Sequence, residues 1–159
     1  MSKAHVITVS DGVSAKTRED ESGRALVRIL KSAGFEVAEP AVVPDDERRI
    51  ADAIVAAADD GADVVVTTGG TGLGPRDVTP QATSSVIDFE VPGIGEQMRR
   101  AGAASTPMAA LSRSMAGVRG QTLIINVPGS PRGAAESLEA VIPVLEHAIR
   151  LLHGNTAHN

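Results

Sequence analysis

Apolar residues along the chain follow two patterns that alternate from one end to the other. Short, largely β-branched runs are typical of strands buried on both faces of a parallel sheet. Such runs lie at residues 5–9, 35–37 with 41–43, 64–68 and 122–125. Between them, apolar residues recur at the spacing of amphipathic helices, at residues 22–34, 46–59 and 130–154. Because alternating strands and helices form parallel βαβ units, the pattern predicts an α/β fold with helices on both faces of a mostly parallel sheet.

Glycine and proline residues predict where several of these elements end or bend. Gly34 follows the first long helix, where a left-handed residue commonly ends a helix. Pro40 is expected to bend or interrupt the second strand, since it has no N–H to donate to the ladder. Pro143 lies inside the last helix and would clash with the carbonyl of Glu139, so we expect a kink or a break there. Residues 154–159 are expected to form a loose tail.

The segment between the third and fourth strands predicts smaller elements. Thr79 is expected to cap a helix that begins at Pro80 and ends near Ile87. A second helix, a short third helix and a small hairpin are predicted at residues 94–103, 106–111 and 116–125. With these, the whole chain is assigned to one domain, residues 1–159.

Polar residues follow each of the four main strands at the point where the strand ends. The four segments are Ser10-Asp11-Gly12, Pro44-Asp45, the stretch from Gly69 to Asp77, and Asn126-Val127-Pro128-Gly129. The carboxyl ends of parallel strands lie along one edge of a sheet, where ligands bind in open α/β folds. We therefore expect these four segments to converge on one cleft.

The third of these segments has the composition of an anion-binding loop. Gly69, Gly70, Gly72 and Gly74 remove four β-carbons within six residues, so backbone N–H groups can approach a ligand closely. Hydroxyls of neighbouring threonines add donors, Arg76 adds a planar cationic group, and Asp77 adds a carboxylate. The loop therefore predicts a site for a phosphorylated ligand together with a metal ion. The alternative is that the glycines only make a tight connection.

Two familiar phosphate-binding loops do not fit this stretch. A Walker A loop ends in Gly-Lys-Ser/Thr, but the last lysine of the chain is Lys31. A Rossmann fingerprint requires G-x-G-x-x-G at the start of a helix. Here the glycines have a different spacing, and Pro75 follows where that helix would begin.

Composition and charge exclude several classes of function. The net charge is −5, the pI is about 5.3, and the aromatic residues are Phe35 and Phe89 alone, so general nucleic-acid binding is not expected. The chain has no cysteine, which excludes disulfides and thiolate metal sites. It has no apolar run long enough to span a membrane. These features predict a cytoplasmic protein that does not bind membranes.

A set of motifs spread over nearly the whole chain resembles one known family. The motifs are SDG at 10–12, VVPDD at 42–46, TTGGTG at 67–72, PRDVTPQAT at 75–83, PGIGEQMR at 92–99, LSRS at 111–114 and NVPGSP at 126–131. They are similar, in the same order, to those of the molybdopterin adenylyltransferases, the MogA/MoaB family that includes the G domain of gephyrin. The combination of the glycine loop with RDVTP and NVPG is highly specific.

The resemblance implies an activity, a fold and a set of partners. The family transfers AMP from ATP, with Mg²⁺, to the terminal phosphate of molybdopterin and releases pyrophosphate. Its fold is a three-layer α/β/α sandwich, and its members are usually trimers. Here Ala103, Ala104, Met108 and Ala109 could supply the subunit interface. The expected partners are molybdopterin, ATP and, downstream, a molybdenum-inserting protein.

The same resemblance implies roles for individual residues. Asp45 and Asp77 match the metal-binding and catalytic acids, and carboxylate oxygens are ligands that Mg²⁺ prefers. Substrate contacts match Ser10, Asp11, Gly70, Thr71, Gly72, Ser112, Asn126, Pro128 and Gly129, to which the composition of the loop adds Gly69 and Arg76.

Structural alternatives remain for each acid. Asp45 could cap the helix that begins at Asp46, Asp77 could accept a hydrogen bond within its own loop, and Asp11 could stabilise a turn before Gly12. At the level of the whole protein, the alternative to an enzyme is a molybdopterin-binding paralogue or carrier that does not transfer AMP. Asp45 and Asp77 together favour the enzyme, since a carrier does not require a pair of metal ligands.

Overall fold

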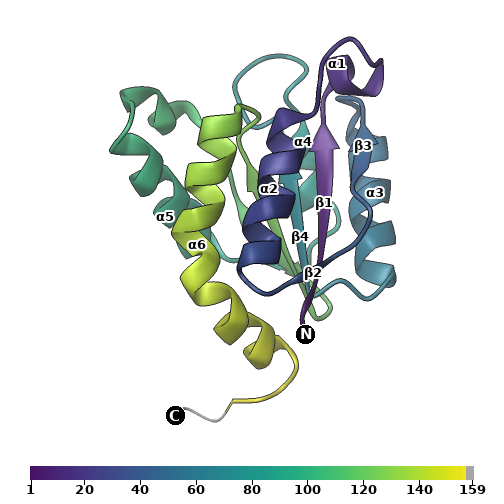
Figure 1. The fold of residues 1–159 in the computed structure, drawn as a ribbon, viewed down its shortest axis with the longest axis vertical. Coiled ribbons are helices and arrows are strands. Elements are labelled where there is room, and N and C mark those ends of the chain that lie inside the picture. Colours follow the sequence, from purple (N-terminus) through teal and green to yellow (C-terminus); the bar gives the residue numbers. More distant parts are fainter. Residues whose placement is uncertain (157–159) are drawn as a thin grey trace.

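A seven-stranded sheet forms the middle layer of the structure (Figure 1). The structure is a computed structural model, and it describes residues 1–156. The strands are β1 (Lys3–Val9), β2 (Glu36–Val37), β3 (Ala41–Val43), β4 (Val64–Thr68), β5 (Phe89–Glu90), β6 (Ala116–Arg119) and β7 (Thr122–Val127). Their order is β2-β1-β4-β7-β6-β5, and β3 also pairs with β1. The strands from β1 to β4 and β7 pair in parallel, whereas β5–β6 and β6–β7 are antiparallel, so the predicted mostly parallel sheet is confirmed.

Helices cover both faces of this sheet. They are α1 (Asp11–Ser14), α2 (Glu21–Ser32), α3 (Glu47–Asp59), α4 (Thr79–Ser84), α5 (Pro92–Ala103), the 3₁₀ helix η1 (Pro107–Leu111) and α6 (Pro131–Leu152). Helices α2, α5 and α6 lie on one face, and α3 and α4 lie on the other (Figure 1). The α/β/α sandwich expected from the family resemblance is therefore the observed architecture.

The continuous apolar runs of the strands supply two cores at once. Because side chains alternate across a strand, Val64 and Val66 of β4 pack under α2 and α6, while Val65 packs under α3. The same alternation holds in β1 and β7, where Ile7 and Ile124 belong to the α3 side. This is why residues 64–66 of β4 and 123–125 of β7 are apolar on both faces of the sheet.

Several predicted helix ends are confirmed by capping hydrogen bonds. Asp46 caps α3 by accepting from the N–H of Arg49 at 2.9 Å, and Ser130 caps α6 by accepting from the N–H of Gly133 at 3.1 Å. Gly34 follows α2 with a φ of 96°. Since Asp46 is the cap of α3, its neighbour Asp45 is free of that structural role.

Other predictions about local structure are wrong. Of the kink or break expected at Pro143, the break is wrong, because α6 continues through the proline, with buried Val141 and Leu145 on either side of it. Thr79 is the first residue of α4 and does not cap it, since its hydroxyl donates to the carbonyl of Gly69 at 2.9 Å. Helix α4 also ends at Ser84, before the predicted end near residue 87.

Two short elements were not predicted, and one predicted feature lies partly outside the described residues. Helix α1 occupies part of what was expected to be a polar loop, and β5 is too short to give a periodic signal. Within the expected loose tail, the N–H groups of Gly154 and Asn155 donate to carbonyls at the end of α6. Residues 157–159 lie outside the described part of the chain. Among residues 1–156, no helix is both long and apolar enough to cross a lipid bilayer.

Candidate active site

The register of the sheet brings the carboxyl ends of four strands level with one another. Thr68 at the end of β4 is paired with Thr8 of β1 and with Val127 of β7, and Val9 is paired with Val43 of β3. The segments that follow these strands therefore begin at one edge of the sheet. This confirms the expected convergence of loops that are far apart in the sequence.

A cleft of about 740 Å³ lies at this edge. Its walls come from the ends of β1 and β4, the N-terminal ends of α2 and α6, and the segments that follow β3, β4 and β7. Of the predicted site residues, it is lined by Ser10, Asp45, Gly69, Gly70, Asp77 and Gly129. Five acidic side chains and only one arginine, Arg18, line this cleft. A polyphosphate could therefore bind here only with additional positive charge.

A second cleft, of about 490 Å³, adjoins the first on the other side of the glycine loop. It contains Thr71, Gly72, Ser112 and Pro128 from the predicted set, together with the exposed side chains of Leu73, Met108 and Leu111. The two clefts have Gly70, Asp77 and Gly129 in common. Two ligands bound side by side would therefore meet at these three residues.

Asp11 and Asp45 hold each other in place through reciprocal hydrogen bonds. The N–H of Asp11 donates to Oδ2 of Asp45, and the N–H of Asp45 donates to Oδ1 of Asp11, both at 3.0 Å. Arg76 donates to both carboxylate oxygens of Asp11, at 2.9 and 3.0 Å. Arg76 thus lies at the rim of the larger cleft, bound to Asp11, and its predicted contact with substrate remains a prediction.

The two linked acids have pKa values shifted in opposite directions. Partial burial raises the pKa of the Asp45 carboxyl above its usual value, and the negative charges of Asp11 and Asp77 act the same way. The hydrogen bonds from Arg76 hold the pKa of the Asp11 carboxyl below its usual value, and the N–H of Asp45 adds to that effect. The negative charge of Asp11 is therefore stabilised at the rim of the cleft, whereas the negative charge of Asp45 is disfavoured inside it.

Asp77 is held within its own loop and still has a carboxylate oxygen available. Its Oδ2 accepts from the N–H of Gly74 at 2.9 Å, so the structural alternative proposed for this acid is part of its role. Among residues 1–156, Oδ1 of Asp77 and Oδ1 of Asp45 accept no hydrogen bond. One oxygen of each acid therefore remains for a metal ion.

The glycine loop combines a backbone conformation that favours glycine with N–H groups that have no acceptor in the protein. Gly70 has a φ of 68°, and a β-carbon there would collide with the hydroxyl of Thr79. Within the described part of the chain, the N–H groups of Gly70, Thr71 and Gly72 donate to no protein acceptor. Three consecutive free N–H groups beside two clefts are the donors that an anion requires.

Not every predicted site residue reaches a cleft. Ser112 does, and its hydroxyl also lies 2.9 Å from that of Ser114. Asn126 has no exposed surface, since it lies inside β7 with its Nδ2 donating to the hydroxyl of Thr67 at 2.9 Å. Its Oδ1 has no partner within residues 1–156. In this structure Asn126 therefore joins two strands beneath the site, and its predicted contact with substrate remains a prediction.

Two arginines beside the site were not singled out from the sequence. Arg113 donates to the carbonyls of Gly72 and Asp77, and Arg99 of α5 donates to the carbonyl of Ser114. Arg113 stands within the LSRS motif, but nothing in the sequence reveals that its partners are backbone carbonyls of a loop 36 to 41 residues away.

Comparison with known proteins identifies the family of this chain. Residues 5–147 match the family model described as a probable molybdopterin binding domain. The chain belongs to this family. It is 40% identical to a molybdopterin adenylyltransferase of Helicobacter pylori, over 94% of this chain and 87% of that protein. It is also 41% identical to a molybdenum cofactor biosynthesis bifunctional protein of Synechococcus elongatus, over 95% of this chain but only 47% of that protein.

A solved structure of the family has the same fold. The molybdopterin biosynthesis enzyme MoaB from Thermus thermophilus superposes with a TM-score of 0.91 and is 51% identical in sequence. The match covers 97% of this chain and 98% of that one. The family resemblance predicted from the motifs is thus confirmed along nearly the whole chain.

Proposed function

We propose that this protein transfers AMP from ATP to the terminal phosphate of molybdopterin, with Mg²⁺ as cofactor. The activity follows from family membership and from relatives named as molybdopterin adenylyltransferases. The observation that carries the proposal is the pair of clefts that meet at Gly70, Asp77 and Gly129. A reaction between two phosphorylated substrates requires such a junction, because an oxygen of one phosphate must approach the phosphorus of the other in line.

Each cleft suits one of the two substrates. The smaller cleft contains the loop N–H groups of Gly70–Gly72 and the hydroxyl of Ser112, which would hold the terminal phosphate of the pterin. The larger cleft would hold ATP, with its α-phosphorus at the junction. Attack by the pterin phosphate forms the new P–O–P linkage, and the bond from the α-phosphorus to pyrophosphate breaks.

The residues of the larger cleft fit a magnesium ion. Asp45 and Asp77 each offer one carboxylate oxygen that accepts no hydrogen bond from residues 1–156. Those residues contain no group of three or more possible metal ligands, which agrees with the habit of Mg²⁺ to bind one or two carboxylates plus phosphates and water. When bound, the ion would neutralise charge on the phosphates of ATP. The hydrogen bonds from Asp11 and Gly74 orient the two acids toward that role.

The proposal includes an assembly, a partner and a location. Ala103, Ala104 and Met108 are exposed in the single chain, which leaves them available for the interface of the expected trimer. A molybdenum-inserting protein would take up the adenylylated product. The absence of cysteine is compatible with a reducing cytoplasm.

The test is a reconstituted reaction. Purified protein is incubated with molybdopterin, ATP and MgCl₂, and adenylylated molybdopterin and pyrophosphate are measured over time. We expect both products in equal amounts, and neither when magnesium is chelated. Tight binding of molybdopterin without either product would favour the carrier instead.

A further inference from the structure

The side chain and backbone of Arg113 hold the glycine loop from outside. Its Nε donates to the carbonyl of Gly72 at 2.9 Å, and its Nη2 donates to the carbonyl of Asp77 at 2.7 Å. Its Nη1 lies 3.2 Å from Oε1 of Gln81 in α4, and its backbone N–H donates to the carbonyl of Thr71 at 2.8 Å. One residue therefore contacts the beginning of the loop, its end and the helix that follows.

The remaining contacts of this loop are either internal or at its borders. Gly74 and Asp77 bond to each other, and Thr79 bonds to Gly69 and Gly70. Arg76 reaches out to Asp11 through side chains that are 65% and 48% exposed, where ion pairs contribute little. Within residues 1–156, Arg113 is the one residue outside the loop whose partly buried side chain donates to two backbone carbonyls of the loop, those of Gly72 and Asp77.

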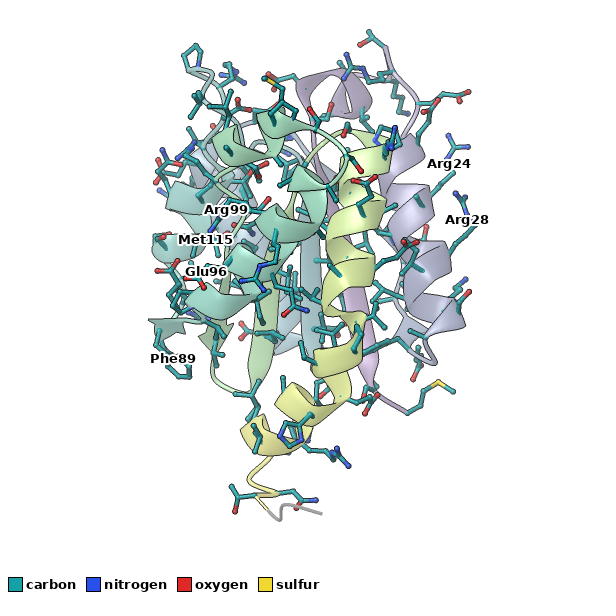
Figure 2. The ribbon with its side chains drawn as sticks, turned by 90° about the vertical axis from the view of Figure 1, so that its left-hand side faces the viewer. Arg24, Arg28, Phe89, Glu96, Arg99 and Met115 are labelled. Carbon is teal, nitrogen blue, oxygen red and sulfur yellow. The ribbon has the colours of Figure 1, made fainter. Side chains whose placement is uncertain are left out.

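The segment that carries Arg113 is itself firmly attached to the fold. The carbonyl of Ser114 accepts a hydrogen bond from Nη1 of Arg99, which projects from α5 toward the segment that leads into Met115 (Figure 2). Ser114 is only 2% exposed, and the next carbonyl, of Met115, accepts from the N–H of Asn126 in β7 at 2.8 Å. Arg113 therefore connects the glycine-rich loop to a segment that is hydrogen-bonded to both α5 and β7.

We propose that Arg113 is a positioning residue that fixes the carboxylate of Asp77 and the free N–H groups of the loop relative to each other. Asp77 is held at its carbonyl by Arg113 and at its carboxylate by Gly74, so its backbone cannot rotate without breaking one of the two. The same guanidinium fixes Gly72 in the wall of the smaller cleft. Arg113 thereby sets the geometry at which the two clefts meet, a role in catalysis that rests on the proposed function.

The geometry requires the planar fork of arginine. Two different nitrogens of one guanidinium bind two carbonyls, while a third faces Gln81. A lysine has a single nitrogen at the end of a flexible chain, so it could replace one of these contacts but not the pair. Arg113→Lys should therefore preserve the positive charge and lose the positioning.

The experiment compares Arg113→Lys and Arg113→Ala with a matched control, Arg119→Ala. The Arg119 side chain also donates from a partly buried guanidinium to a backbone carbonyl, that of Val86 at 2.8 Å, but it lies at the opposite edge of the sheet. Amide hydrogen exchange of the ligand-free proteins is followed residue by residue by NMR. Steady-state transfer of AMP is measured with each substrate varied in turn.

We expect the Gly74 amide to exchange about tenfold faster or more in both Arg113 variants, and kcat to fall by about ten- to a hundredfold. KM for each substrate should change less than kcat, because Arg113 touches neither ligand. Arg119→Ala should leave the loop exchange and kcat at wild-type values. If Arg113→Ala does not fold, Arg113→Lys carries the test.

Two results would overturn the proposal: unchanged loop exchange in folded Arg113 variants, or recovery of wild-type kcat by Arg113→Lys. Failure of the proposed function is distinguishable, since the wild type would then transfer no AMP. In that case the exchange of the Gly74 amide alone decides whether Arg113 positions the loop.

Discussion

The two edges of the sheet both contain charged clefts, but their charges are arranged in different ways. At the carboxyl edge, Asp45 and Asp77 each keep one carboxylate oxygen without a partner among residues 1–156. At the amino edge, a groove of about 550 Å³ contains Asp63, Asp88 and His153. Asp63 there accepts from the N–H of Lys3 at 2.8 Å and pairs with Nε2 of His153 at 2.9 Å.

The two edges differ in which of their polar groups have hydrogen-bond partners within the protein. Asp88 at the amino edge also has a partner, because it accepts from the N–H of Gly120 at 2.7 Å. These acids close turns and attach a helix end, so their hydrogen bonds serve the fold. Within residues 1–156, Oδ1 of Asp88 and the exposed carboxylate of Asp59 also accept no hydrogen bond, so unpaired carboxylate oxygens alone do not separate the edges. The carboxyl edge differs in its three consecutive loop N–H groups, of Gly70–Gly72, which donate to no acceptor among the described residues. A count of charged residues would not separate the two edges.

The largest difference between the edges is expected when one acidic side chain at each edge is replaced by a neutral one. Asp77→Ala should lower AMP transfer by more than about a hundredfold, which is roughly 3 kcal/mol of barrier, because it removes one of the two proposed magnesium ligands. Molybdopterin binding should persist, since the loop N–H groups and Ser112 need no metal. Asp45→Ala should act in the same direction. Product formation and direct pterin binding are measured on each variant.

The matched control for this prediction is Asp63→Asn at the amino edge. Asparagine can still accept from the N–H of Lys3, so the fold and the activity should both be retained. Near-normal transfer by Asp77→Ala would contradict the assignment of catalysis to the carboxyl edge. Loss of pterin binding by a folded Asp77→Ala protein would contradict the proposed division between the two clefts.

An intermediate effect is expected from one glycine at each edge. Gly70 and Gly120 both have positive φ, 68° and 59°, so an alanine at either position costs about 1–2 kcal/mol in backbone conformation. At Gly70 the new methyl group would also collide with Thr79 and approach Asp45 at 3.4 Å, whereas at Gly120 it meets no atom within 4 Å. Gly70→Ala should therefore lose more stability than Gly120→Ala, and only Gly70→Ala should lose activity. Chemical denaturation and transfer assays would show equal losses if the two edges were equivalent.

The smallest effect is expected from the opposite pKa shifts of Asp45 and Asp11. Because the folded pKa of Asp45 is raised, its contribution to stability is present below its unfolded pKa and is lost as pH rises through the folded value. The folded pKa of Asp11 is lowered, so its contribution is present above its unfolded pKa and is lost as pH falls through the folded value.

In magnesium-free protein at pH 7 we therefore expect Asp45→Asn to raise Tm by about a degree or two, and Asp11→Asn to lower it. Both differences should shrink as the pH approaches 3. Thermal unfolding across that pH range is the measurement. An Asp45→Asn protein that is less stable than wild type at pH 7 would show that the site does not store unfavourable charge.

Much of the fold and part of the site could be predicted from the sequence because their signals are local. The period of apolar residues located the strands and the long helices, and the helix starts predicted at residues 46 and 130 fall on Asp46 and Ser130, the residues that cap α3 and α6. The cap assigned to Thr79 failed, because its hydroxyl found a better acceptor in Gly69, ten residues away. Of the kink or break expected at Pro143, the break is wrong, since packing of Val141 and Leu145 outweighs one lost hydrogen bond.

The sequence by itself determined which segments meet at the carboxyl edge, since alternating strands and helices imply parallel pairing, which places the strand ends along one edge of the sheet. Only the tertiary structure decided which charges there are paired and which are free. Arg76 is bound to Asp11, 65 residues away, and Arg113 is bound to carbonyls that the sequence does not distinguish from any others. A hydrogen bond depends on separations of a few tenths of an ångström between distant segments, and no local pattern encodes them.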